Sequence, residues 1–141
     1  MWGTCAGLIL LSDEANATKR GGQDLIGGLA VRVHRNHFGR QVDSFVADLA
    51  LPFLGEGAAR YQGIFIRAPV VEEVLRPDEV EVLATVEGRR GDEDSSSSSR
   101  DVVAVRQENI LGMSFHPELT SDERIHAWWL GDVLKRLESK G

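Results

Sequence analysis

The feature that most constrains this fold is a glycine-flanked cysteine motif, Gly3-Thr4-Cys5-Ala6-Gly7, which an apolar run follows directly. A nucleophile between two such glycines is typical of a nucleophile elbow, in which a strand turns sharply into a helix. Side chains must be absent beside that strained turn, and the two glycines meet this requirement. We therefore expect a helix over Ala6–Ser12, with the Cys5 thiol at its N-terminus, where the helix dipole favours the thiolate.

The motif leaves a second interpretation open, namely a small buried structural cysteine beside two turn glycines. If the elbow is correct, the backbone N–H of Ala6 supplies one donor of an oxyanion hole.

The rest of the chain predicts an α/β fold. Several segments alternate apolar and polar residues or form short apolar runs, as strands do. These segments are 29–35, 45–51, 63–69, 80–86, 102–105 and 110–115. A helix is expected at the C-terminal end, where Trp129, Val133 and Leu137 recur every four residues and Thr120 and Glu123 form a capping-box pattern. The Ser-rich stretch at about 88–101 is expected to be a disordered loop.

Size and charge restrict the classes of function. A chain of 141 residues is the size of one domain, so we expect a single domain over 1–141. The net charge of −6 argues against a nucleic acid or a membrane surface as a partner. The one cysteine cannot form an internal disulfide, which favours the cytosol. No Cys/His cluster has metal-ligand spacing, and no cofactor is expected.

A thiol nucleophile needs a base and a group that orients the base. Of the four histidines, His34, His37 and His126 are expected to be surface or structural residues. His116 differs because it follows an apolar strand and stands two residues before Glu118. Pro117 favours extended geometry at His116, so the imidazole and the carboxylate should project together. A strand-end histidine beside an exposed glutamate is the alternative.

Four segments carry a resemblance to a known family: "GTCAGLILL", "RNHFGRQVDSF", "GIFIRAPVVEEV" and "SFHPELT". They resemble the glutaminase subunit of the two-component pyridoxal 5′-phosphate synthase, which belongs to the class I (triad) glutamine amidotransferases. The resemblance implies a three-layer, flavodoxin-like α/β fold. The segments "RNHFGRQVDSF" and "FIRAP" disfavour other cysteine hydrolases of the same superfold.

The resemblance also implies roles for single residues. Cys5 matches the nucleophile that attacks the side-chain amide of L-glutamine, His116 matches the general base, and Glu118 matches the residue that orients His116. Glutamine is expected to contact three further residues: Arg35, Ile66 and Arg67. In the family, the ammonia passes to a separate synthase subunit, which builds pyridoxal 5′-phosphate.

One departure from the family pattern is evident. In the family, several β–α units precede the elbow, and a Gly-rich loop among them gives a second oxyanion donor. Here the elbow begins at residue 3, so we expect a fold that lacks these N-terminal units and exposes an apolar sheet edge. The alternative function is accordingly a catalytically impaired product that only binds the synthase or has no function.

Overall fold

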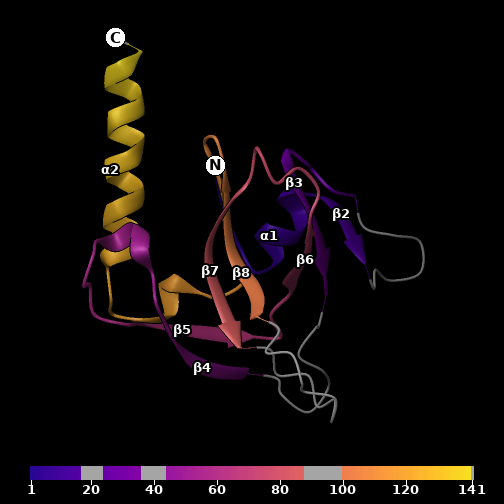
Figure 1. Cartoon of the computed structure of the whole chain (residues 1–141), viewed down its shortest axis with the longest axis horizontal. Helices are drawn as coiled ribbons and strands as arrows, with labels where there is room; N and C mark the ends of the chain where they lie inside the picture. Colours follow the sequence, from indigo (N-terminus) through magenta and orange to yellow (C-terminus); the bar gives the residue numbers. More distant parts are fainter. Residues whose placement is uncertain (17–23, 36–43, 88–99, 141) are drawn as a thin grey trace.

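The computed structural model describes residues 1–16, 24–35, 44–87 and 100–140. These residues form a seven-stranded mixed sheet, a separate two-stranded sheet and two α-helices (Figure 1). The predicted α/β class is confirmed.

The larger sheet contains seven strands: β1 (Trp2–Thr4), β2 (Ser12–Asn16), β3 (Leu29–His34), β6 (Val70–Val74), β7 (Glu81–Glu87), β8 (Arg100–Gln107) and β9 (Ile110–Met113). The smaller sheet pairs β4 (Ser44–Leu49) with β5 (Tyr61–Ile66). The helical elements are α1 (Ala6–Leu11), α2 (Arg124–Ser139) and the short 3-10 helices η1 (Pro52–Leu54) and η2 (Pro117–Leu119).

The strand order of the larger sheet is β1-β9-β8-β6-β3-β2, with β7 paired to β8. The pairs β1–β9 and β2–β3 are parallel, whereas the other pairs are antiparallel. Helix α1 lies close against this sheet at Gly112 of β9. A Cβ atom at Gly112 would lie 2.6 Å from the Leu8 side chain and 2.9 Å from that of Leu29, so a larger residue there would force these two side chains to move.

Two apolar clusters hold the elements together. One lies around α1 and β3 and contains Leu8, Leu29 and Val33. The other joins the β4–β5 ribbon to β8, β9 and the start of α2, with Phe65 and Phe115 among its fully buried members. The second cluster therefore links the smaller sheet to the strand that leads to His116.

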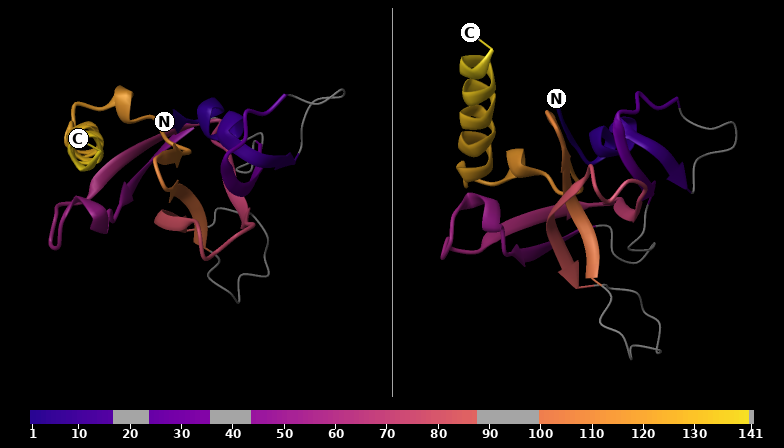
Figure 2. Two further views of the ribbon diagram at one scale, coloured as in Figure 1. Left: turned by 90° about the horizontal axis from the view of Figure 1, so that it is seen from above. Right: turned by 45° about the horizontal axis from the view of Figure 1, so that its top comes forward.

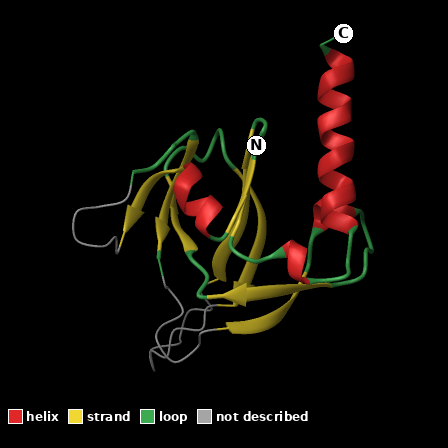
Figure 3. Ribbon diagram, turned by 180° about the vertical axis from the view of Figure 1, so that it is seen from behind, coloured by secondary structure: helices red, strands yellow, loops and turns green. Residues whose placement is uncertain are grey.

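Helix α2 buries apolar side chains mainly through its first turns, and its C-terminal part projects from one side of the molecule (Figures 2 and 3). Ile125 is buried, and Trp128 and Trp129 pack against the second cluster. The leucines at 130, 134 and 137 are 60–62% exposed. The expected periodicity is present, but the sheet does not extend far enough to cover the whole apolar stripe. Neither helix of the described residues is long and apolar enough to cross a membrane.

All six expected strands are present, with two errors in detail. A register shift between Val82 and Ala84 buries Leu83 and leaves Val82 45% exposed, so the simple alternation predicted for β7 is wrong. Strands β2 and β6 were not expected, because the acidic sequences "SDEAN" and "VVEEV" do not alternate in the usual way.

The predicted capping box at the start of α2 is also wrong. The Thr120 hydroxyl accepts a hydrogen bond from the N–H of Asp122, and the Asp122 carboxylate accepts one from the N–H of Arg124. Glu123, at the N-cap position, makes no capping bond through its side chain. Of the expected Ser-rich loop, residues 88–99 lie outside the described residues, while Arg100 and Asp101 belong to β8.

Candidate active site

The predicted strand–turn–helix at Cys5 is confirmed. Strand β1 ends at Thr4, α1 begins at Ala6, and Cys5 between them has φ 53° and ψ −106°. The N–H of Cys5 donates to the carbonyl of Met113 over 2.7 Å, which ties the turn to β9. A positive φ is strained for a residue with a side chain, and such strain is typical of an elbow that presents its nucleophile.

Only one of the two flanking glycines is required by space. A Cβ atom at Gly3 would lie 2.6 Å from the backbone carbon and oxygen of Gly7, which is closer than real Cβ contacts. A Cβ atom at Gly7 would meet nothing within 4 Å. The expected requirement for glycine is therefore confirmed at Gly3 and is wrong at Gly7. A side chain at Gly3 would point from β1 into the backbone of α1, whereas a side chain at Gly7 would point into open space.

The environment of the thiol opposes ionisation. Burial raises the pKa of the Cys5 thiol, the backbone N–H of Ala6 partly offsets this, and the negative charge of Glu118 raises the pKa further. The expected preference for thiolate is therefore wrong, since desolvation outweighs the effect of a single short helix. A protonated thiol must lose its proton to a base when it attacks a substrate.

His116 and Glu118 lie together, as the sequence predicts. Nδ1 of His116 is 2.6 Å from Oε1 of Glu118. The backbone of His116 is extended, but Glu118 lies in η2, so a 3-10 turn brings the two side chains together. The side chain of His116 is 20% exposed and that of Glu118 is 51% exposed, which leaves the pair accessible to a small substrate.

Strand β5 contacts both the thiol and the histidine. The N–H of His116 donates to the carbonyl of Ile64 over 2.9 Å, and Sγ of Cys5 lies 3.8 Å from the carbonyl oxygen of Ile66. Sequence reasoning missed Ile64 and Met113 because they act through backbone carbonyls, which every residue type carries.

The expected substrate-contacting residues lie at the ends of two strands that belong to different sheets. Ile66 ends β5 beside the thiol, and Arg67 follows it with φ 44°. Arg35 directly follows β3 in the larger sheet, and residues 36–43 of its motif lie outside the described residues. Their common contact with glutamine stays a prediction.

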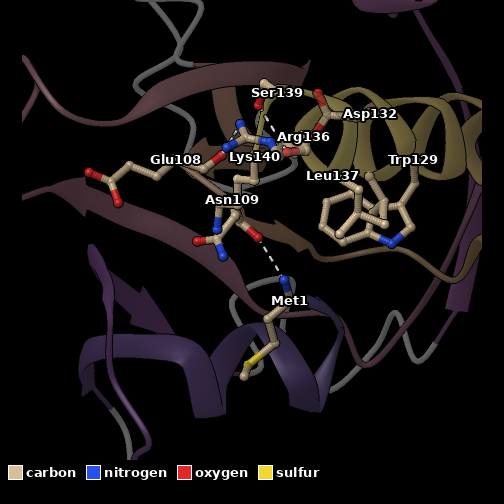
Figure 4. Close-up of a pocket in the computed structure, with 10 residues that line it drawn as sticks. Met1, Glu108, Asn109, Trp129, Asp132, Arg136, Leu137, Ser139 and Lys140 are labelled. Atoms are coloured by element: carbon tan, nitrogen blue, oxygen red, sulfur yellow. Dashed lines mark hydrogen bonds and ion pairs between the residues drawn. The ribbon is translucent and has the colours of Figure 1, made fainter.

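A pocket of about 570 Å³ lies elsewhere, between α2 and the turn that joins β8 to β9 (Figure 4). Met1, Asn109, Trp129, Arg136 and Leu137 are among the residues that line it, whereas Cys5, His116 and Glu118 do not. Within the described ranges, no group of three or more His, Cys, Asp or Glu residues could hold a metal ion.

The chain is similar to known proteins in both sequence and fold. The model of the SNO glutamine amidotransferase family matches residues 1–135. A protein from Kineococcus radiotolerans named pyridoxal 5′-phosphate synthase subunit PdxT is 46% identical over 97% of this chain and 61% of its own length. The protein of the same name from Thermococcus onnurineus is 47% identical over 94% of this chain and 58% of its own length.

A solved structure described as the crystal structure of glutamine amidotransferase has a TM-score of 0.71 and 42% sequence identity. The match covers 92% of this chain and 58% of that one. The chain thus spans less than two thirds of the length of the relatives it matches.

Proposed function

The chain belongs to the SNO glutamine amidotransferase family, and we propose that it hydrolyses L-glutamine to L-glutamate and ammonia. We assign the nucleophile to Cys5, the general base to His116 and the orientation of that base to Glu118. The observation that carries the proposal is the arrangement of these groups around β5, where one strand contacts both the elbow cysteine and a histidine paired with a carboxylate.

The reaction begins with transfer of the thiol proton. Because the pKa of the Cys5 thiol is raised, the thiol is protonated until the imidazole of His116 accepts its proton. Sulfur then attacks the amide carbon of glutamine, and the backbone N–H of Ala6 donates to the oxyanion that forms. The protonated imidazole gives the proton to the departing nitrogen, and ammonia leaves a γ-glutamyl thioester.

Hydrolysis of the thioester completes the cycle. His116 now accepts a proton from water, the hydroxide attacks the thioester carbon, and the thiol recovers its proton as glutamate leaves. Glu118, as an ionised carboxylate, accepts a hydrogen bond from Nδ1–H of His116 throughout and stabilises the imidazolium.

Substrate and partner complete the proposal. Arg67 and Arg35 bind the charged end of glutamine, because a guanidinium matches a carboxylate in charge and geometry. The carbonyl of Ile66, the residue directly before Arg67, lies 3.8 Å from the thiol of Cys5. The relatives named above are subunits of pyridoxal 5′-phosphate synthase by name. We infer that the ammonia passes to the synthase subunit of that enzyme, in the cytosol.

The test is ammonia release from glutamine, measured with and without the synthase subunit. A glutamine-derived diazo-ketone should label Cys5 and stop the release, and Cys5→Ser should abolish turnover because a hydroxyl is a far weaker nucleophile. Retained activity in Cys5→Ser would rule out the assignment. Binding to the synthase subunit without any ammonia release would instead support a purely binding role.

A further inference from the structure

Three aromatic side chains, those of Phe45, Phe65 and Phe115, pack together beside the part of β5 that contacts Cys5 and His116. Phe65 is completely buried and stacks on Phe45 of β4, with ring centroids 4.6 Å apart and planes 3° from parallel. Its ring also packs against Phe115, at 5.5 Å and 55°. Phe115 directly precedes His116, so Phe65 contacts the segment that carries the base.

Phe65 stands between the two residues whose carbonyls face the site. The carbonyl of Ile64 accepts a hydrogen bond from the N–H of His116, and the carbonyl of Ile66 lies beside the thiol of Cys5. In a strand, the carbonyls of residues i and i+2 point the same way while the side chain between them points to one face. Movement of Phe65 therefore moves both carbonyls.

We propose that Phe65 is a positioning residue that, through its packing between Phe45 and Phe115, fixes how far apart Cys5 and His116 lie. The inference rests on the proposed function, since it concerns the nucleophile and the base of that reaction. In this role Phe65 acts through the carbonyls of Ile64 and Ile66, which contact the base and the thiol.

The shape of phenylalanine suits this role. Its flat ring has few rotamers, so it holds a defined distance between the ribbon and the strand end at little cost in entropy. A smaller aliphatic residue at position 65 does not fill the space that the phenylalanine ring occupies. Strand β4 and the segment that carries His116 then relax into that space. A displacement of about 1 Å between reacting groups can lower the rate by roughly 100-fold.

The experiment compares Phe65→Leu with the control Phe53→Leu. Phe53 is a partly buried aromatic residue at the edge of the same apolar cluster, and its ring packs on Trp128 with centroids 4.6 Å apart. With the synthase subunit present, we expect Phe65→Leu to lower kcat by roughly 10- to 100-fold while KM for glutamine stays within about threefold. Phe53→Leu should lower Tm but keep the wild-type kcat.

A second readout does not require turnover. The pH dependence of Cys5 alkylation is measured in the wild type, in His116→Ala and in Phe65→Leu. If Phe65 positions the base, the Phe65→Leu profile moves toward that of His116→Ala. If Phe65→Leu does not fold, Phe45→Leu replaces it in the experiment. Phe45 is only partly buried, so its substitution costs less stability, and it loosens the stack of Phe45 on Phe65.

The outcomes separate the two proposals. A wild-type chain that releases no ammonia refutes the proposed function, and the alkylation profile then decides the role of Phe65 alone. Wild-type kcat and a wild-type alkylation profile in Phe65→Leu would overturn the positioning role. An equal fall of kcat in Phe53→Leu would overturn it too, since the effect would then be a general loss of stability.

Discussion

The imidazole of His116 and the carboxylate of Glu118 are joined by a contact of 2.6 Å between Nδ1 and Oε1. An ionised carboxylate can only accept a hydrogen bond, so the hydrogen belongs to Nδ1 and the lone pair to Nε2. This tautomer is the one that a general base needs. The turn η2 that joins the two residues thus determines the protonation pattern of the base as well as its position.

Glu118→Gln should lower kcat for ammonia release by roughly 100-fold or more, because a neutral amide stabilises the imidazolium of His116 far less. KM for glutamine should change little, since the effect arises in the transition state. Glu123→Gln is the matched control, because Glu123 is exposed and makes no capping bond. An unchanged kcat in Glu118→Gln would remove Glu118 from the mechanism.

The Cys5 thiol should react with iodoacetamide only slowly at neutral pH, and the rate should rise with pH up to a pKa above the ordinary cysteine value. Burial raises this pKa first, and the charge of Glu118 adds to it. The thiolate is the charged form, so removing a nearby negative charge favours it, and Glu118→Gln should shift the profile to lower pH. Mass spectrometry can follow the reaction without ambiguity, because the chain has one cysteine. A shift to higher pH would contradict the assignment.

Gly3 and Gly7 should respond oppositely to alanine. Gly3→Ala places a Cβ atom 2.6 Å from the backbone of Gly7, and we expect a loss of roughly 1–3 kcal/mol in the free energy of unfolding together with lost activity. Gly7→Ala meets open space in a helix and should raise stability by about 0.5–1 kcal/mol. Denaturant unfolding of both variants is the measurement. Equal destabilisation would show that the elbow is not packed in this way.

The local part of this site could be predicted from the sequence, whereas the long-range part could not. The motif around Cys5 specifies its own turn through Gly3, and His116 and Glu118 are near neighbours in the chain. The contact of β5 with both groups depends on how the β4–β5 ribbon packs on Phe115. No local pattern encodes that packing.

The errors have the same origin. The pKa of the thiol depends on burial, which the helix N-terminus alone does not reveal. The register shift near Val82 depends on pairing with β8, and the exposure of Leu134 depends on where the sheet ends. Periodicity indicates which element forms and which face is apolar, but tertiary context decides what covers that face.

Arg67 offers a way to separate a side-chain effect from a backbone effect. Its φ of 44° is strained for arginine and for alanine but not for glycine. If the guanidinium binds glutamine, Arg67→Ala and Arg67→Gly should raise KM equally, by a factor that corresponds to about 1.5–3 kcal/mol. Steady-state kinetics of both variants provide the test. A rise in KM in only one of them would assign the effect to the backbone instead.

Asp132 should attach α2 to the larger sheet in a pH-dependent manner. Its carboxylate accepts two hydrogen bonds of 2.8 Å from Arg106 of β8 and one of 2.9 Å from Arg136. Burial alone would raise the pKa of Asp132, but the hydrogen bonds and charges of Arg106 and Arg136 outweigh it and lower the pKa. A lowered pKa in the folded state means that the stabilisation is complete above the unfolded pKa and is lost as the pH falls through the folded one.

We therefore expect Asp132→Asn to lower the free energy of unfolding by about 1–2 kcal/mol at pH 7. The difference between the variant and the wild type should shrink as the pH falls below the ordinary aspartate range, because the wild-type carboxylate then also becomes neutral. Denaturant unfolding at several pH values measures this difference, and Asp78→Asn is the control, since Asp78 lies exposed in the turn before β7. A difference that stays constant down to low pH would mean that the charge of Asp132 does not hold α2 in place.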